Sequence, residues 1–285
     1  MLSPLEASIK SKIESIGVPL EKWNIDIFRG ILTGLNEAFI ISGEKKNELI
    51  AADPKSAELI RPILRGRDIK RYAYIDPDLW LIFIPWHFPL EKDSSITGAS
   101  KEAEALFSQR YPAVYKHLLL HKDKLSKRNK AETGIRYEWY ALQRWGAKYR
   151  DDFSMQKVMY NDICQRLSFC LVPENVFCVN TVYFIKNNEH IKYLLAYLNT
   201  KIVDWYYRTL SVQLGQKAVR MFSIYVLKIP APIVSVETEE DVNKLVDIIN
   251  ASPESNTEEI EQQIEEIFYK IFNFNTEEIE FIKNL

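Results

Sequence analysis

The chain has 285 residues, of which 47% are hydrophobic and 12% aromatic, enough for one large domain or two ordinary ones with a substantial core. This composition excludes a disordered chain. The net charge of −2 is unevenly distributed, because residues 61–150 carry 18 basic and 10 acidic side chains whereas residues 235–285 carry 3 and 14. The local net charges of +8 and −11 indicate a region that binds a polyanion, joined to a segment that must stay off it.

The three cysteines, Cys164, Cys170 and Cys178, have neither the even count of a disulfide framework nor the CxxC spacing of a zinc site. We therefore expect buried free thiols in a reducing cytoplasm. Residues 1–10 lack a basic start followed by an apolar run, and no apolar stretch approaches the length of a membrane span. These features predict a cytoplasmic protein.

The sequence pattern of the first half of the chain predicts a mixture of helices and strands. Ser3 as a cap, Pro4 in the first turn and Glu6 as an early acid predict a helix that runs to about Ile16. The patterns that follow predict, in order, a strand around Ile25 and Ile27, a strand at 38–41, helices at 46–52 and 54–61, a buried strand at 79–86, and a long polar helix at 99–126 that breaks at Pro112.

The second half predicts three more strands and a long helix before an acidic tail. The expected elements are strands at 157–160, 176–179 and 182–185, a helix at 189–211, a last strand at 222–232 that ends in prolines, and acidic helices at 239–250, at 257–272 and from Thr276. Thr276 lacks a full capping box, because Ile279 stands where an acid or Gln is required. Without a regular βαβ rhythm, the fold class expected is α+β, a mixed β-sheet with long helices and a C-terminal acidic helical appendage.

Enzyme motifs are scarce in the sequence. No GxGxxG follows a strand and no GxxxxGK[ST] occurs. His117 and His121 have the i, i+4 spacing of a metal pair, but position 118 is not Glu and no third ligand is apparent, so we expect a solvated helix face instead. Asp53, Asp68 and Lys70 have the acid…acid-x-Lys order of some metal-dependent nucleases, although Asp53 falls in a predicted turn.

Nucleic-acid binding fits the basic middle better. Residues 122–150 interleave basic side chains with aromatic rings and an amide, as phosphate contacts and base contacts require. The candidate contacts in this segment are Lys127, Arg128, Arg136, Tyr137, Trp139, Gln143 and Arg144. A solvated charged face is the alternative for the lysines, and we expect Trp139 or Trp145 to belong to the core.

Three further segments provide candidate contacts. The loop SVQLGQKAVRMF, residues 211–222, presents Gln216, Lys217 and Arg220, and is otherwise a plain connector from helix to strand. The glycine-containing loop at 29–36 and the basic segment IRPILRGRDIKRYAY at 60–74 complete the set with Arg29, Thr33, Arg65, Arg67, Lys70 and Arg71. In the alternative for the basic segment, Ile63, Leu64 and Ile69 bury it, and Arg67 or Asp68 forms an internal salt bridge.

Several of these pieces, in this order, resemble the TaqI-like C-terminal specificity domain. They are FRGILTGLNEAFII, LIRPILRGRDIKRY, WLIFIP, YPAVYKHLLLHKDKLSKR, ALQRW, KVMYNDIC, YLLAYLNTKIVDWYYRTLS and the IP-P exit before the acidic helices, and they cover the chain from Trp23 onward. The resemblance implies the target recognition domain of type IIG restriction-modification enzymes and related adenine-specific DNA methyltransferases. The RGILTG segment, with Arg29, Gly30, Thr33 and Gly34, and the RGRDIKRY segment would shape its front.

The resemblance also implies what the chain lacks. The Asn-Pro-Pro-Tyr-type motif and glycine-rich S-adenosylmethionine loop of the methyltransferase part do not occur here. We therefore expect no catalysis and no cofactor in this chain, with S-adenosylmethionine and Mg used only by upstream domains. The expected organisation is an N-terminal helix or linker from an upstream catalytic region at 1–22, a DNA target recognition domain at 23–235 and the acidic appendage at 236–285.

The expected partners are double-stranded DNA and upstream methyltransferase or nuclease domains of the same polypeptide. The appendage would face away from DNA and pack on the domain or on a partner. A metal-dependent nuclease built on Asp53, Asp68 and Lys70, or a protein-interaction module, is the alternative function.

Overall fold

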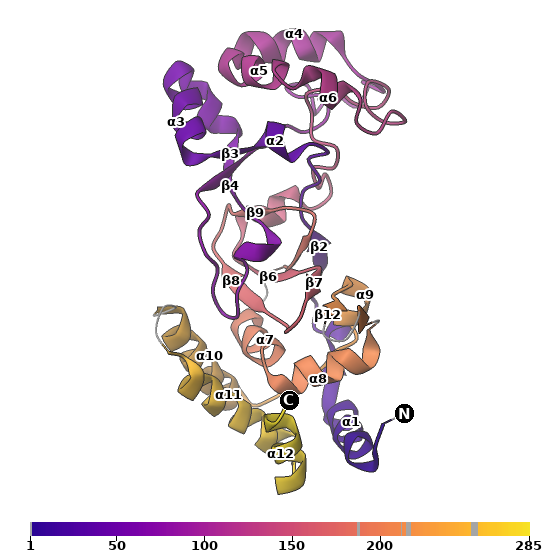
Figure 1. The fold of residues 1–285 in the computed structure, drawn as a ribbon, viewed down its shortest axis with the longest axis vertical. Helices are drawn as coiled ribbons and strands as arrows, with labels where there is room; N and C mark the ends of the chain where they lie inside the picture. The colour runs from indigo at the N-terminus through magenta and orange to yellow at the C-terminus, as the bar shows by residue number, and fades with distance from the viewer. Residues whose placement is uncertain (1, 187–188, 212, 215–217, 252–255) are drawn as a thin grey trace.

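The computed structural model describes residues 2–186, 189–211, 213–214, 218–251 and 256–285. Its 47% helix and 19% strand, in several mixed sheets, confirm the predicted α+β class. The molecule is elongated, with one group of helices at each end and the sheets between them (Figure 1).

A four-stranded antiparallel sheet in the order β2-β10-β6-β8 lies at the middle of the molecule. Its strands are β2 (Ile27–Arg29), β10 (Val182–Ile185), β6 (Lys157–Asn161) and β8 (Phe169–Val172). Side chains alternate between its faces, so that Val158 and Tyr160 enter one hydrophobic cluster and Met159 enters another. The sheet therefore separates two cores.

The first core lies under a second sheet in the order β3-β5-β4-β9, in which only β4 and β9 are parallel. Phe107, Phe153 and Leu118 are fully buried here. The elements of this half are α2 (Asn36–Phe39), β3 (Ile40–Ser42), α3 (Gly43–Ala52), the 3-10 helix η2 (Pro54–Leu59), β4 (Ile60–Leu64), β5 (Leu79–Ile82), α4 (Lys101–Arg110), α5 (Pro112–Leu119), α6 (Lys122–Ser126), η4 (Arg150–Ser154) and β9 (Phe177–Cys178).

The second core joins the two ends of the chain. Ile9 and Ile13 of the N-terminal helix enter the same cluster as Phe268 and Ile282 of the C-terminal helices, and Lys12 forms an ion pair of 2.7 Å with Glu278. This half contains α1 (Pro4–Ile16), β1 (Gly17–Pro19), η1 (Leu20–Lys22), α7 (Ile191–Leu198), α8 (Lys201–Leu210), α9 (Ser223–Val226), β13 (Pro230–Pro232), α10 (Val236–Ala251), α11 (Glu258–Ile271) and α12 (Thr276–Lys283). The appendage thus packs back on the rest of the chain.

A small sheet at the side of the central one completes the fold. It has the order β11-β12-β7, with β11 (Gln213–Leu214), β12 (Ala218–Arg220) and β7 (Ile163–Cys164), and η3 (Gly66–Asp68) follows β4 nearby. Because β12 pairs with β7, Arg220 comes opposite Ile163, just past the end of β6. This pairing brings Ala218–Arg220 to the side of the central sheet.

Several predicted elements were wrong because strand pairing between distant segments overrides the local sequence pattern. Residues 38–41 end helix α2 and begin β3, and residues 60–64 are strand β4, paired with β5 and β9, not helix. Residues 223–226 are helical, and Pro230–Pro232 pairs with β1 although proline cannot donate a ladder hydrogen bond. Strand β8 was not predicted.

Two other corrections concern helix ends and a histidine. The capping box of α12 is complete one residue earlier than expected, because Asn275 is the cap and the Glu278 carboxylate accepts a hydrogen bond from the Asn275 backbone N–H. The helix at 189–211 is divided between Asn199 and Thr200, where the Asn199 side chain pairs with the backbone of Phe169. His117 is buried and hydrogen-bonded to the Ala38 carbonyl, so it is not on a solvated face.

The described part of the chain contains no helix long and apolar enough to cross a membrane. The three cysteines are free, as predicted; Cys170 and Cys178 are buried and Cys164 is partly so.

Candidate nucleic-acid interface

Charged side chains from distant segments meet at one end of the central sheet. Arg29 ends β2, Asn161 ends β6 and Arg220 ends β12, while Asp162 follows β6 directly. We call Arg29, Gly66, Asn161, Asp162 and Arg220 the sheet-end cluster.

Asp162 lies between two guanidinium groups of this cluster. Its carboxylate is 8% exposed and sits 3.2 Å from Arg29 Nη2 and 3.8 Å from Arg220 Nε. Arg29 Nε also donates to the Asn180 carbonyl at 2.6 Å, and its guanidinium lies 5.4 Å from the ring centre of Tyr183. Two cations share one anion, so the cluster keeps a positive charge while both arginines remain nearly half exposed.

The turn at Gly66 packs against the end of β6. A Cβ atom at position 66 would lie 2.8 Å from Asn161 Oδ1, so a larger residue there would displace the Asn161 amide. The turn is held by Asp68, which accepts from the Arg65 backbone N–H and from Arg65 Nε and Nη2. Arg67 is exposed on the same turn and has no ion pair or side-chain hydrogen bond within the described ranges.

The charged side chains of the basic segment at 60–74 differ in their exposure and in their partners. Asp68 is 4% exposed and is the residue in the internal salt bridge, with Arg65 as its partner. Lys70 is exposed, although its ammonium group donates to the Arg67 carbonyl. Arg71 points away from this turn, to the Asn199 carbonyl and Glu261 of α11, so its predicted role as a phosphate contact is wrong in this conformation.

Burial also removes several predicted contacts in the segment at 127–145. Tyr137 is fully buried and stacks on Trp86, and the indole of Trp139, which is 8% exposed, donates to Glu104. Thr33 is 2% exposed and bonded to Asn36. These side chains support the fold and cannot reach DNA as they stand.

Arg128 is a structural residue too. Its guanidinium donates to the carbonyls of Leu125, Thr33, Trp139 and Ala141 at 2.7–3.0 Å. One side chain thereby ties the loop after α6 to the glycine-containing loop at 29–36. This structural role could not be predicted from the run of basic residues, because the sequence does not distinguish a buried arginine from an exposed one.

Other predicted contacts remain open to solvent. Lys127, Arg136 and Arg144 are exposed, and Gln143 is half-buried beside Gly34. The Arg144 backbone pairs with Leu32, three residues beyond Arg29. Gln216 and Lys217 lie outside the described residues.

The structure gives no support to a metal-dependent nuclease. The Asp68 carboxylate is occupied by Arg65, and that of Asp53 caps η2 by accepting from the Lys55 backbone. Within the described ranges, no three His, Cys, Asp or Glu side chains gather as a metal site.

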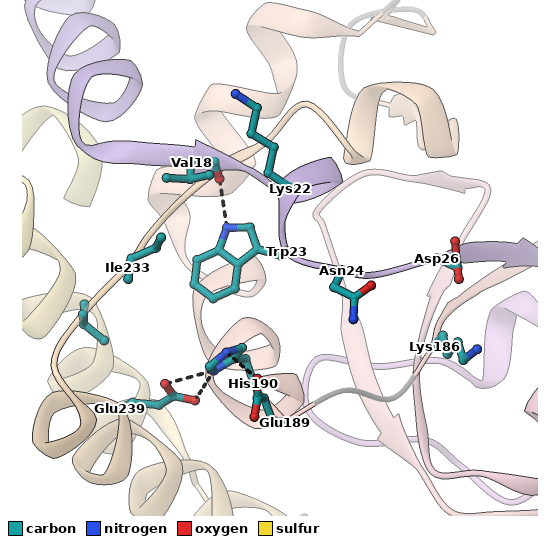
Figure 2. Close-up of a pocket in the computed structure, with 11 residues that line it drawn as sticks. Val18, Lys22, Trp23, Asn24, Asp26, Lys186, Glu189, His190, Ile233 and Glu239 are labelled. Atoms are coloured by element: carbon teal, nitrogen blue, oxygen red, sulfur yellow. Dashed lines mark hydrogen bonds and ion pairs between the residues drawn. The ribbon is translucent and has the colours of Figure 1, made fainter.

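A cavity of about 610 Å³ lies away from all these residues, between the N-terminal strand, the start of α7 and α10. Figure 2 shows Trp23 beside Val18 and His190, with Glu239 reaching the imidazole. Trp23 Nε1 donates to the Val18 carbonyl at 3.1 Å, and Glu239 Oε1 is 2.8 Å from His190 Nδ1. The cavity is lined by three acidic side chains, Asp26, Glu189 and Glu239, and two lysines, Lys22 and Lys186. This near-neutral charge does not favour the binding of a polyanion.

A positively charged sheet end that lies apart from an acidic helical end is a charge distribution typical of a nucleic-acid-binding module. Comparison with known proteins names the family: the profile of the TaqI-like C-terminal specificity domain matches residues 61–231, and the chain belongs to this family. The chain is thus a DNA-recognition module, and the nuclease alternative is not favoured.

Similar proteins agree with this assignment. The type II methyltransferase M.MjaIV of Methanocaldococcus jannaschii is 26% identical over 254 residues, which are 86% of this chain and 78% of that protein. The structures of the type IIG restriction endonuclease BpuSI and of the type IIL restriction-modification enzyme MmeI in complex with DNA share the fold, with TM-scores of 0.50 and 0.54 at 13% and 14% identity. Each match covers 94% of this chain but only 32% and 35% of those enzymes, so the chain spans about a third of their length.

Proposed function

We propose that this chain reads a short sequence in double-stranded DNA and thereby directs a methyltransferase or nuclease that lies elsewhere, as in a type IIG-like enzyme. In the intact enzyme it would hold the target while the neighbouring methyltransferase flips a base. The chain itself performs no catalysis and binds no cofactor. S-adenosylmethionine and Mg belong to the catalytic domains, which act with it in the cytoplasm.

The observation that carries the proposal is the pair Arg29 and Arg220, which come from distant segments and are held over one carboxylate at the open end of a sheet. Arg29 is held through Nε and Nη2 and Arg220 through Nε, so Nη1 of Arg29 and both Nη groups of Arg220 are available for phosphate or base edges. Arg67, on the turn that packs against the end of β6, and Arg144, whose backbone pairs with Leu32, are exposed as well. Together they provide both anchoring and reading groups.

The position of the acidic helices supports the same arrangement. Helices α10, α11 and α12 lie at the end of the molecule beyond α7, away from α4 and α5 (Figure 1). Residues 235–285, which include them, carry a net charge of −11, so DNA would be repelled from this end. Bound DNA would therefore follow the side of the sheets.

Fluorescence anisotropy of a labelled random duplex, titrated with the 285-residue chain at several salt concentrations, tests the proposal. The logarithm of the affinity should fall linearly with the logarithm of salt concentration, with a slope of about −0.9 per phosphate contacted. Binding that is independent of salt, or no binding to DNA of any sequence, would contradict it.

The name of the M. jannaschii relative makes methyl transfer by this chain the second candidate. Radioactive methyl incorporation into DNA from S-adenosylmethionine tests it directly. The sequence contains no Asn-Pro-Pro-Tyr-type motif to hold a target adenine, so we expect no incorporation. Incorporation above background would require a catalytic centre in this chain.

A further inference from the structure

A tight turn beside β2 carries two cations that have no partner in the described part of the chain. Residues 144–149, which we call the basic turn, reverse direction at Gly146, whose φ of 74° is left-handed. The Tyr149 N–H closes the turn by donating to the Gly146 carbonyl at 2.9 Å. Arg144 and Lys148 are exposed, and neither makes a side-chain hydrogen bond or an ion pair within the described ranges.

The acidic side chains that follow the basic turn are already paired with other cations. Asp151 lies 3.2 Å from Arg150 Nε, and Asp152 lies 3.2 Å from the ammonium group of Lys186. Each acid is therefore balanced by a cation outside the turn. The two positive charges of the basic turn remain available for an anion.

Two sets of contacts fasten the basic turn to the segment that begins with Arg29. The backbones of Arg144 and Leu32 exchange two hydrogen bonds, of 2.9 and 3.0 Å. The Tyr149 ring stacks on Phe28 with ring centres 4.6 Å apart, and its hydroxyl donates to the Arg29 carbonyl at 2.8 Å. Tyr149 thus joins the turn to the residue whose guanidinium belongs to the sheet-end cluster.

The basic turn and the sheet-end cluster are close enough to contact one duplex. Leu32 is three residues beyond Arg29, a path of at most roughly 11 Å, and it is paired directly with Arg144. Duplex DNA carries one phosphate charge per about 1.7 Å of its axis, so about six such charges lie within this length. Several phosphates of one duplex can therefore be contacted from both places at once.

We propose that Arg144 and Lys148 bind DNA phosphates, and that Tyr149 is the positioning residue that holds them in a fixed relation to Arg29. Arginine and lysine neutralise phosphate charge without reading bases, so the basic turn sets the register of the chain on the duplex. A turn that is already held in place binds phosphates without the cost of ordering it. The inference rests on the proposed function and deepens it by naming residues that contact and position the DNA backbone.

Anisotropy titrations of a labelled random duplex with the 285-residue chain, at several salt concentrations, test the two contacts. Arg144→Ala and Lys148→Ala should each make the salt slope shallower by about 0.9. Lys270→Ala, at an exposed position of the acidic helix α11, is the matched control and should keep the wild-type slope. If the wild-type chain binds DNA and both variants keep its slope, the inference is overturned while the proposed function stands. If the wild-type chain binds no DNA, both fail.

Tyr149→Phe tests the positioning role, because it keeps the stacked ring and removes only the hydrogen bond to Arg29. The affinity for the duplex should fall about two- to ten-fold, the range that one hydrogen bond contributes. Tyr206→Phe, which loses a hydrogen bond to Glu14 of α1, is the matched control and should bind DNA like the wild-type chain. Thermal unfolding confirms that each variant is folded at the temperature of the titration.

A double substitution separates positioning from a merely structural role. Lys148→Ala should lower the affinity less in the Tyr149→Phe background than in the wild-type chain, because the turn no longer holds Lys148 in place. Equal effects of Lys148→Ala in the two backgrounds, or an unchanged affinity of Tyr149→Phe, would overturn the positioning role of Tyr149.

Discussion

The guanidinium of Arg71 is paired with the carboxylate of Glu261, which lies 190 residues further along the chain. Arg71 belongs to the basic segment that the resemblance places at the front of the domain, and Glu261 belongs to the acidic helix α11. Both side chains are mostly buried, at 15% and 21% exposure. The most basic and the most acidic parts of the chain are thus joined inside the molecule, and the appendage is part of the fold.

Arg71→Ala should destabilise the chain without weakening its contact with DNA. The change leaves Glu261 without its ion-pair partner and removes a nearby positive charge from the buried Glu265, and we expect a loss of about 3 kcal/mol in the free energy of unfolding. Urea denaturation measures this value. Lys244→Ala, which removes an exposed ion pair with Asp241 on α10, is the control and should change stability by less than about 0.5 kcal/mol. Equal effects of the two variants would show that the buried pair adds nothing.

Glu265 should make stability depend on pH. Burial raises the pKa of this carboxyl from 4.5 to about 7, despite the hydrogen bond from the Lys201 backbone and the nearby Arg71. As pH rises from 4.5 to 7, the unfolded chain loses this proton while the folded chain keeps it. The folded state therefore binds more protons in this window, and its stability falls as pH rises.

Glu265→Gln should remove this part of the pH dependence. The amide can still accept from the Lys201 N–H, so above pH 7 the variant should be more stable than the wild-type chain by on the order of 3 kcal/mol. Below pH 4.5 the two should be about equally stable. Denaturation curves across this range measure the difference, and Glu266→Gln, at an exposed position of the same helix, is the control. A constant difference at all pH values would argue against the assignment.

Substitutions at Arg128 and at Lys127 should have different effects, the first on the stability of the chain and the second on DNA binding. Arg128→Ala leaves four backbone carbonyls without their donor, and we expect a loss of about 3 kcal/mol in unfolding free energy. The exposed Lys127→Ala should keep stability within about 0.5 kcal/mol and make the salt slope of DNA binding shallower by about 0.9. Thermal unfolding and anisotropy measure the two effects. Reversed outcomes would place Arg128 in the interface.

The sequence predicted what local patterns encode. Helix α1 with its cap, the break at Pro112 and the strands at β5, β6 and β10 follow from periodicity and from proline, which acts on its own neighbours. Strand β13 was misread because its partner, β1, lies at the other end of the chain. Strand β8, which pairs with the nearby β6, was missed because it is a four-residue edge strand without a clear alternating pattern. The residues around a strand do not indicate a partner that lies far away along the chain.

The candidate site shows the same limit. The sequence singled out Arg29 and Arg220 as charges, but only the pairing of β12 with β7 brings them to one carboxylate. Asn161 and Asp162 were not predicted, because an Asn-Asp dipeptide after a strand is also typical of a plain turn. Tyr137 and Trp139 were predicted to contact DNA, because aromatic rings are suited both to stacking on bases and to packing in a core. In the structure both side chains are buried in the core.

Arg65 and Arg67 provide the sharpest contrast within one turn. Arg67 is exposed and unpaired within the described ranges, so Arg67→Ala should make the salt slope of DNA binding shallower by about 0.9 and leave stability within about 0.5 kcal/mol. Arg65→Ala removes the partner of the buried Asp68 and should cost about 3 kcal/mol of unfolding free energy.

The charge-preserving variant Arg67→Lys is the control, and its salt slope should equal that of the wild-type chain, because an ammonium group also neutralises a phosphate. Anisotropy titrations on one random duplex, run below the temperature at which Arg65→Ala begins to unfold, compare all four proteins. A slope that changes in Arg65→Ala but not in Arg67→Ala would mean that the turn presents its other arginine to DNA. The Arg65–Asp68 pair would then have to open when DNA binds.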